Sequence, residues 1–323
     1  MREALFVKHN SPKWKKYESF RSDNPDELAQ FFLEVTDDLA YAKTFYPRSK
    51  TTEYLNGLAS RFHQTLYRNK KEKSNRFILF WKIELPLLFK KYERAMFYSL
   101  MFFVSAFLIG ILSARYDEQF LRIIMGQQYI NMTEENIAKG DPFGVYKQAS
   151  ELPMFYYIAQ NNLKVAFYTF ASGIFLSAGS VIILIKEGIR LGSFEYYFFS
   201  KGLGLQSVLV IWIHGTLEIS AIILAGGAGL VLGNSILFPK TYKRMESFKR
   251  GAKDGMKICI GIVPIWVFAA FLEGFVTRHT TMPAWLSIFI LGTSLLFIIW
   301  YVILYPNQLF KSLAYKATNG RKF

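Results

Sequence analysis

A histidine and a glutamate lie inside a long apolar stretch of this chain, where ionisable residues are rare. His214 and Glu218 lie four residues apart inside an apolar run over residues 203–237. A helix brings side chains with that spacing onto one face. A charged group at the centre of a membrane costs roughly 2.5–3.5 kcal/mol on insertion scales, so it usually has a partner or a use. Glu273 also lies well inside an apolar run, and Glu187 lies at the inner edge of another. These four residues are the functional candidates.

Three kinds of chemistry are open to this set: binding a metal, relaying protons, or lining a polar path for an ion or a headgroup. If Glu218 and Glu273 face one another, His214 can pair with either of them and relieve the cost of burial. His-x-x-x-Glu is only half of the His-Glu-x-x-His pattern, and no second histidine stands nearby. We therefore assign no catalytic residue, metal or cofactor. The structural alternative is a hydrogen-bonded clasp that holds a broken helix against its neighbour.

The elements that position these residues are predicted to be membrane helices. Crossing a hydrocarbon core of about 30 Å takes about 20 apolar residues. Runs of this kind cover residues 95–113, 165–185, 203–237, 256–276 and 283–305. We predict an all-α, polytopic helical membrane protein with a transmembrane domain over residues 95–323. The lone Cys259 excludes an intrachain disulfide and a cysteine-based zinc site.

The distribution of basic residues predicts the orientation, because positively charged loops stay on the cytoplasmic side. Of the 39 Lys and Arg residues, 19 fall within residues 1–94, which places the N-terminus inside. The segment 114–163 carries six acidic and four basic residues and is predicted to be external. Residues 186–202 and 239–257 are both predicted to be internal loops. The C-terminus is then cytoplasmic as well.

Those two internal loops require the run 203–237 to leave and return on the same side. Its 35 residues are too few for two full crossings and a turn. We therefore expect a broken or re-entrant hairpin. The glycines that could break the helix are Gly215, Gly226, Gly227 and Gly229. Irregular backbone at membrane depth is tolerated only where protein or a wet cavity covers it.

Two further units precede the first span. Residues 1–76 are predicted to form a cytosolic helical hairpin domain, with one helix that opens at Pro25 and another that begins near Thr51. Residues 77–94 mix apolar bulk with cations, which is typical of an amphipathic elbow in the headgroup plane. The cations expected to contact anionic headgroups are Lys82, Lys90, Lys91 and Arg94. We expect no nucleic-acid partner, because orientation alone requires basic charge next to the membrane.

Several motifs resemble one family of bacterial membrane proteins. The stretch His214-Gly215-x-x-Glu218 is followed by Ala225-Gly-Gly-Ala-Gly-Leu-Val-Leu-Gly233. Together with Ile236-Leu-Phe-Pro239 it resembles the stage II sporulation protein M family. The stretches Asn24-Pro-Asp-Glu-Leu, Tyr54-Leu-Asn-Gly-Leu-Ala and Glu273-Gly-Phe-Val-Thr-Arg278 resemble its larger, non-sporulation branch.

The resemblance implies an integral protein of the bacterial cytoplasmic membrane with five to seven segments. The founding member of the family acts as a scaffold for peptidoglycan-degrading partners. Longer relatives are often associated with MoxR-type ATPases and other envelope proteins. The long N-terminal domain of this chain departs from the founding member. The family offers no well-established catalytic residues to carry over.

Three functions compete on these observations. The leading hypothesis is a non-enzymatic membrane protein that organises an envelope complex. The alternative is a transporter-like protein or lipid scramblase that uses the buried Glu and His in a broken-helix cavity. The third is an intramembrane hydrolase built around His214 and Glu218. Small-residue faces at 226–233 would permit a homodimer.

Overall fold

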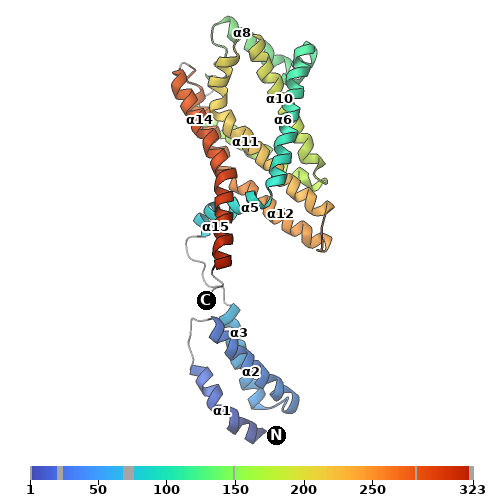
Figure 1. The fold of residues 1–323 in the computed structure, drawn as a ribbon, viewed down its shortest axis with the longest axis vertical. Coiled ribbons are helices and arrows are strands. Elements are labelled where there is room, and N and C mark those ends of the chain that lie inside the picture. The colour runs from blue at the N-terminus through green and yellow to red at the C-terminus, as the bar shows by residue number, and fades with distance from the viewer. Residues whose placement is uncertain (1, 20–24, 68–75, 148–149, 281, 320–323) are drawn as a thin grey trace. The chain divides into compact units, whose positions relative to one another are not determined.

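The structure, a computed structural model, describes residues 2–19, 25–67, 76–147, 150–280 and 282–319 (Figure 1). The described residues are predominantly helical, and no strand occurs among them. The chain divides into two compact units, Met1–Arg76 and Phe77–Phe323. Each unit has a hydrophobic core of its own.

The N-terminal unit has three helices in its described part, α1 (Glu3–Ser19), α2 (Pro25–Phe45) and α3 (Lys50–Tyr67). The sequence predicted the α2–α3 hairpin and missed α1. This first helix contains Pro12, has few apolar residues and shows little amphipathic pattern. It nevertheless contributes Phe6, Trp14 and Tyr17 to the core. Trp14 Nε1 also donates a hydrogen bond of 2.7 Å to Asp38 Oδ2 of α2.

The predicted elbow is helical. It consists of α4 (Arg76–Leu79), the π-helical η1 (Phe80–Glu84) and α5 (Leu85–Lys91). Pro86 lies in the first turn of α5, where its missing N–H is of little consequence. Tyr92, with φ −112° and ψ 24°, interrupts the helix before α6 begins.

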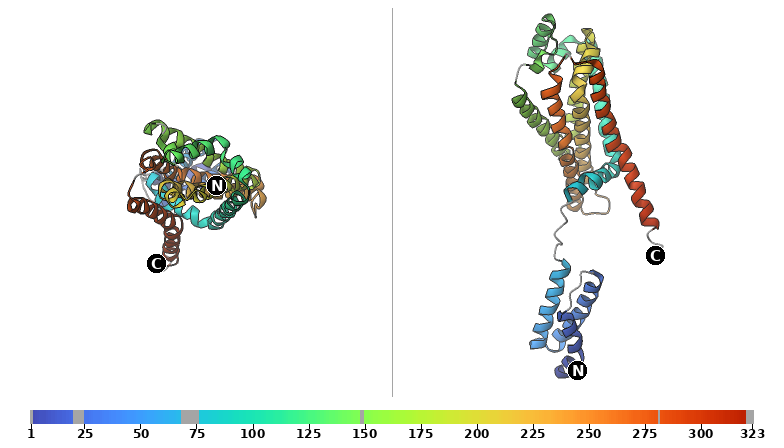
Figure 2. Two further views of the ribbon diagram at one scale, coloured as in Figure 1. Left: turned by 90° about the horizontal axis from the view of Figure 1, so that it is seen from above. Right: turned by 90° about the vertical axis from the view of Figure 1, so that its left-hand side faces the viewer.

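The rest of the second unit is a helical bundle with short helices at one end. Its elements are α6 (Glu93–Tyr116), α7 (Glu118–Met125), α8 (Gln127–Ala138), η2 (Gly144–Lys147), α9 (Glu151–Ala171), η3 (Ser172–Ile174), α10 (Ala178–Ser200), α11 (Gly204–Leu237), α12 (Arg244–Gly261), α13 (Val263–Phe271), η4 (Leu272–Thr277), α14 (Ala284–Ile299), η5 (Trp300–Leu304) and α15 (Tyr305–Asn319). Figure 2 shows α14 and α15 joined through η5 as one long rod.

Four helical stretches among the described residues are long and apolar enough to cross a membrane: Glu93–Tyr116, Gly204–Leu237, Arg244–Thr277 and Ala284–Tyr315. Helices α9 and α10 have 21 and 23 residues, which is the length of a span, but they are less apolar. The predicted class, an all-α polytopic membrane protein, is confirmed.

The expected hairpin over 203–237 is wrong. Residues Gly204–Leu237 form one α-helix of 34 residues, about 51 Å long at 1.5 Å per residue. None of the four proposed helix-break glycines has a positive φ. The closest atoms to an added Cβ would be Ser99 Oγ at 2.6 Å for Gly226, Met96 Sδ at 2.3 Å for Gly227 and Ser180 Oγ at 2.1 Å for Gly229. These glycines serve close helix packing, so they do not mark a turn.

The single span expected over residues 165–185 is also wrong, because a turn divides it between α9 and α10. Helix α9 ends at Ala171, and α10 begins at Ala178. Between them Leu176 and Ser177 adopt left-handed conformations, with φ of 53° and 71°. The turn is apolar and holds no proline, so a hydropathy pattern passes over it. Residues 186–200, expected in an internal loop, are therefore part of α10.

Contacts between helices give their directions. Helices α6 and α10 are parallel, because Gly188 and Gly192 lie against Phe103 and Phe107 respectively. Helices α10 and α11 are antiparallel, because Glu195 lies against Trp212 and Ser180 lies against Gly229. The segment α12–η4 is antiparallel to α11, because Ser247 contacts Ser235 and Thr277 contacts His214. It is also antiparallel to α9, because Phe155 lies against Gly274 and Phe170 against Gly255.

The helices α6, α9, α10, α11, α12–η4 and α14–α15 therefore alternate in direction. The start of α6 and the end of α15 lie at the same end of the bundle, which we call the α5 end (Figure 1). The opposite end, with α7 and α8, is the α8 end. The two errors in the predicted helices compensate, because two antiparallel helices, α9 and α10, replace the single helix expected over 165–185, and the single helix α11 replaces the two-armed hairpin expected over 203–237.

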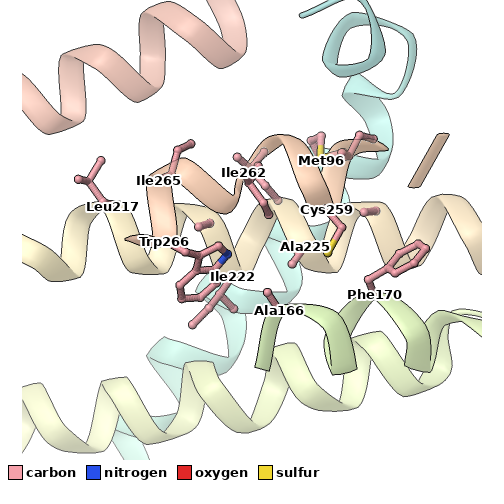
Figure 3. Close-up of a cluster of buried hydrophobic side chains, with 14 of the residues drawn as sticks. Met96, Ala166, Phe170, Leu217, Ile222, Ala225, Cys259, Ile262, Ile265 and Trp266 are labelled. Carbon is pink, nitrogen blue, oxygen red and sulfur yellow. The ribbon is translucent and has the colours of Figure 1, made fainter. Parts of the chain in front are cut away.

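The core of the bundle lies where α11 meets α6, α9 and α12–α13. Figure 3 shows Trp266 and Ile222 in this cluster, with Ala166 and Phe170 of α9 beside them. Trp266 is fully buried, and Cys259 packs in the same cluster as a small apolar side chain. This packing fixes α11 between its neighbours and so sets the positions of its polar residues.

Candidate functional site

Helix α11 and the π-helix η4 bring three ionisable side chains together. His214 and Glu218 lie one turn apart on α11, as their spacing predicted. Glu273 comes from η4, whose wider turn is a feature often found at functional sites. One ligand atom from each of the three side chains lies within 4.8 Å of the others. The predicted meeting of Glu273 with His214 and Glu218 is present in the structure.

His214 is held on one side of its ring and open on the other. Its side chain is only 5% exposed. Nδ1 forms a hydrogen bond of 2.9 Å with Thr277 Oγ1, one turn after Glu273. Nε2 lies 3.9 Å from Glu273 Oε2, which is too long for a hydrogen bond. Within the described part of the chain, the ring therefore has a fixed orientation and a nitrogen without a hydrogen-bond partner.

Glu218 faces a cavity of about 330 Å³ between α6, α10 and α11. No hydrogen bond or ion pair to Glu218 occurs among the residues that the structure describes. The short elements at the α8 end contribute Met125, Tyr129 and Tyr146 to the lining of the cavity. The Tyr146 ring meets the His214 ring edge-on, with centroids 5.9 Å apart. The pKa of Tyr146 is raised well above its usual value, mainly by burial and to a smaller extent by the nearby Glu273 carboxylate.

Glu187 lines the same cavity together with Arg190, one turn further along α10. The two side chains form an ion pair of 2.5 Å, and Glu187 is 16% exposed against 64% for Arg190. Gly215 also lines the cavity, where an added Cβ would meet only Ile219 Cδ1, at 3.9 Å. Glu187 therefore lies in the same cavity as His214 and Glu218, but its negative charge is already balanced by Arg190.

The four predicted headgroup cations divide into two pairs. Lys91 forms an ion pair of 2.6 Å with Asp254, and Lys90 one of 2.5 Å with Glu93. Burial lowers the pKa of Lys91, but its hydrogen bonds to Asp254 and Tyr92 outweigh this and the pKa is raised. Lys82 and Arg94 are exposed. Lys90 and Lys91 therefore bind neighbouring acidic residues, whereas Lys82 and Arg94 are available to a ligand.

Three residues near the site were missed by the sequence analysis. Thr277 stands four residues after Glu273, and Arg190 three after Glu187, so helical spacing could have indicated both. Glu195 is buried at 5% exposure and accepts hydrogen bonds from Trp212 Nε1 at 2.7 Å and Ser207 Oγ at 3.3 Å. It was missed because residues 186–202 were predicted to be a loop.

The cluster departs from the series of nucleophile, base and carboxylate that hydrolases use. Thr277, His214 and Glu273 have the chemical order of such a series. The carboxylate does not hydrogen-bond the ring, because the two atoms are 3.9 Å apart. Two carboxylates beside one imidazole ring instead resemble a site that holds a positive charge.

Comparison with known proteins places this site inside a family. The model of the family described as stage II sporulation protein M matches residues 99–278, a range that includes every residue of the cluster. A second model, for a domain of unknown function (DUF8413), matches residues 4–68. Uncharacterized protein MJ0793 of Methanocaldococcus jannaschii is 29% identical over 123 residues, which are 37% of this chain and 68% of that protein. No solved structure matches. Because the first match covers more than half of its length, the chain belongs to the stage II sporulation protein M family.

Proposed function

We propose that this chain is a non-enzymatic membrane protein that organises a complex at the cell envelope, with its N-terminal unit as the docking module. The observation that carries the proposal is the division of the chain into two units with separate cores. Each unit also matches a family model of its own. An independently packed helical module next to a membrane domain suits the recruitment of a protein partner.

The charge distribution supports a cytoplasmic position for that module. The α5 end gathers the basic residues of the elbow, the 238–243 connection and α12: Lys82, Lys90, Lys91, Arg94, Lys240, Lys243, Arg244, Lys249, Arg250, Lys253 and Lys257. The segment 114–163 at the α8 end carries six acidic and four basic residues. Positively charged segments stay inside, so the α5 end faces the cytoplasm and both termini follow it.

The surface of the N-terminal unit offers contacts for a partner. A groove of about 460 Å³ runs between α1 and α3, with Tyr54 and Arg61 along it and Glu18 at its edge. Leu33 and Phe45 of α2 are 63% and 57% exposed. Aromatic and arginine side chains next to exposed apolar ones are the mixture found at protein interfaces. By family resemblance, the partner is an envelope protein or a MoxR-type ATPase.

Co-purification tests the organising role. The tagged full chain, extracted in gentle detergent, is compared with a Leu33→Glu/Tyr54→Ala variant and with a matched control, Lys311→Glu, on α15. We expect the wild type and the control to retain a defined partner and the Leu33→Glu/Tyr54→Ala variant to lose it. Recovery of no partner by the wild type, or the same partners from all three chains, contradicts the proposal.

A second candidate, passage of ions or lipid headgroups, is favoured by one observation. The cavity inside the membrane domain is lined by Glu187 and Arg190 of α10 and by Glu218 of α11. Ionisable residues in such positions often mark ion or substrate pathways. The purified chain and a Glu218→Gln/Glu273→Gln variant are reconstituted in liposomes, and ion and lipid movement are measured. Flux no higher than in empty liposomes rejects this candidate, and equal flux from both chains removes the carboxylates from it.

A further inference from the structure

We infer that His214, Glu218 and Glu273 form a binding site for one divalent transition-metal ion. The inference goes beyond both functions above and depends on neither. His-x-x-x-Glu alone supplied two ligands, and η4 adds the third. An imidazole nitrogen and two carboxylate oxygens form a ligand set suited to ions such as Zn²⁺, Mn²⁺ or Fe²⁺. The imidazole disfavours Mg²⁺ and Ca²⁺, which prefer oxygen ligands.

The spacing of the ligand atoms suits a shared ion. Two ligands at about 2.1 Å from one zinc ion lie at most about 4.2 Å apart. The 3.9 Å between His214 Nε2 and Glu273 Oε2 is inside this limit. The whole set lies within 4.8 Å, so a side-chain shift of less than about 1 Å would bring all three ligand atoms within reach of one ion. The 3.9 Å between His214 Nε2 and Glu273 Oε2 is too long for a direct hydrogen bond.

The hydrogen bond between His214 Nδ1 and Thr277 Oγ1 is compatible with the tautomer that a metal requires. When Nδ1 donates its proton to Thr277 Oγ1 at 2.9 Å, Nε2 presents its lone pair toward Glu273. Metal-bound histidines nearly always donate the other ring N–H to an oxygen acceptor in this way. The His214 side chain is only 5% exposed, and its Nε2 has no hydrogen-bond partner within the described part of the chain. This unpartnered nitrogen is a second, independent sign of a ligand.

The charges around the cluster leave a deficit of positive charge. Glu218 and Glu273 are two carboxylates beside one imidazole. Arg190, the guanidinium that lines the cavity, is paired with Glu187 at 2.5 Å. A divalent ion balances the two carboxylates and removes their mutual repulsion at membrane depth. The cavity of about 330 Å³ reaches His214 and Glu218, so an ion has space to enter and to keep a water ligand.

Metal binding is measured on the purified full chain in detergent, stripped with EDTA and titrated with Co²⁺ and Zn²⁺. Visible absorption of Co²⁺ and elemental analysis after gel filtration report coordination and stoichiometry. We expect one ion per chain for the wild type, and affinity at least about tenfold weaker for Glu218→Gln and for Glu273→Gln. Glu134→Gln is the control, because its carboxylate pairs with Lys201 at the surface and does not line the cavity, and it should keep the affinity of the wild type.

Two results overturn the site. One is a folded wild type that binds no stoichiometric ion. The other is equal binding by the wild type and by both ligand variants, which indicates adventitious sites elsewhere. If a glutamine variant does not fold, Thr277→Val decides the question, since loss of the Nδ1 acceptor should weaken binding and Thr277→Ser should restore it. The measurement uses neither liposomes nor a partner, so its outcome is separate from the tests of organising and transport.

Discussion

Helices α10 and α11 meet in two ways along their length. Near both ends of their contact, which together we call the packed seam, side chains fill the space: Glu195 accepts hydrogen bonds from Trp212 and Ser207 near one end, and Gly229 leaves no space beside Ser180 near the other. Between these ends lies the cavity, where the Glu218 side chain has no hydrogen-bond partner among the described residues and Gly215 borders open space. Each region contains a carboxylate and a glycine, and the carboxylate is buried in the seam and half-buried in the cavity. The same residue types therefore serve architecture in the seam and a ligand in the cavity, and the difference is whether their contacts are filled.

The largest expected effect on stability comes from removing the Glu195 carboxylate from the packed seam. Glu195→Ala leaves Trp212 Nε1 and the Ser207 hydroxyl without their acceptor, and a buried unsatisfied group costs about 1–3 kcal/mol. We expect the free energy of unfolding in detergent to fall by about 2–4 kcal/mol. Glu134→Ala is the control, because its ion pair with Lys201, at 3.5 Å, lies at the surface. A change as small as in the control would remove the seam from the stability of the bundle.

The glycine of the seam should come next. An added methyl at Gly229 would lie 2.8 Å from Thr169 O and still closer to Ser180 Oγ. Overpacking of this kind typically costs about 1–3 kcal/mol. We expect Gly229→Ala to lower the thermal midpoint of the detergent-solubilised chain. An unchanged midpoint would mean that α9, α10 and α11 do not approach as closely as described.

Removing the charge of the cavity carboxylate should matter much less. Glu218→Gln breaks no hydrogen bond to a described residue and takes away a charge at membrane depth. In EDTA we expect its free energy of unfolding to stay within about 1 kcal/mol of the wild type or to rise. A loss as large as that of Glu195→Ala would place Glu218 in a structural clasp.

Gly215→Ala should have the smallest effect. The added methyl meets only one side-chain atom, at 3.9 Å, and alanine favours a helix over glycine by up to about 1 kcal/mol. We expect a neutral or slightly raised midpoint in a thermal scan. Marked destabilisation would instead fit a turn at this position and would reopen the question of a broken helix.

Helical spacing made part of the site predictable. The four-residue interval between His214 and Glu218 was enough to place both on one face, and the scarcity of carboxylates in the other apolar runs selected Glu273. The partners Thr277 and Arg190 follow the same spacing and could have been found. Tyr146 could not, because η2 is more than sixty residues from His214 in the chain and reaches it only through the fold.

The sequence by itself determined the class of the protein, because apolar runs of span length leave a chain few alternatives to membrane helices. It also singled out His214, Glu218 and Glu273 as ionisable residues inside apolar runs, although it missed the buried Glu195. Only the tertiary structure decided the path between them. A helix that is apolar on all sides carries no periodic pattern to show where it ends. An apolar turn at 172–177 and an unbroken α11 therefore look alike in hydropathy. The contacts that distinguish them, Gly229 against Ser180 and Glu273 against His214, exist only once distant helices have packed.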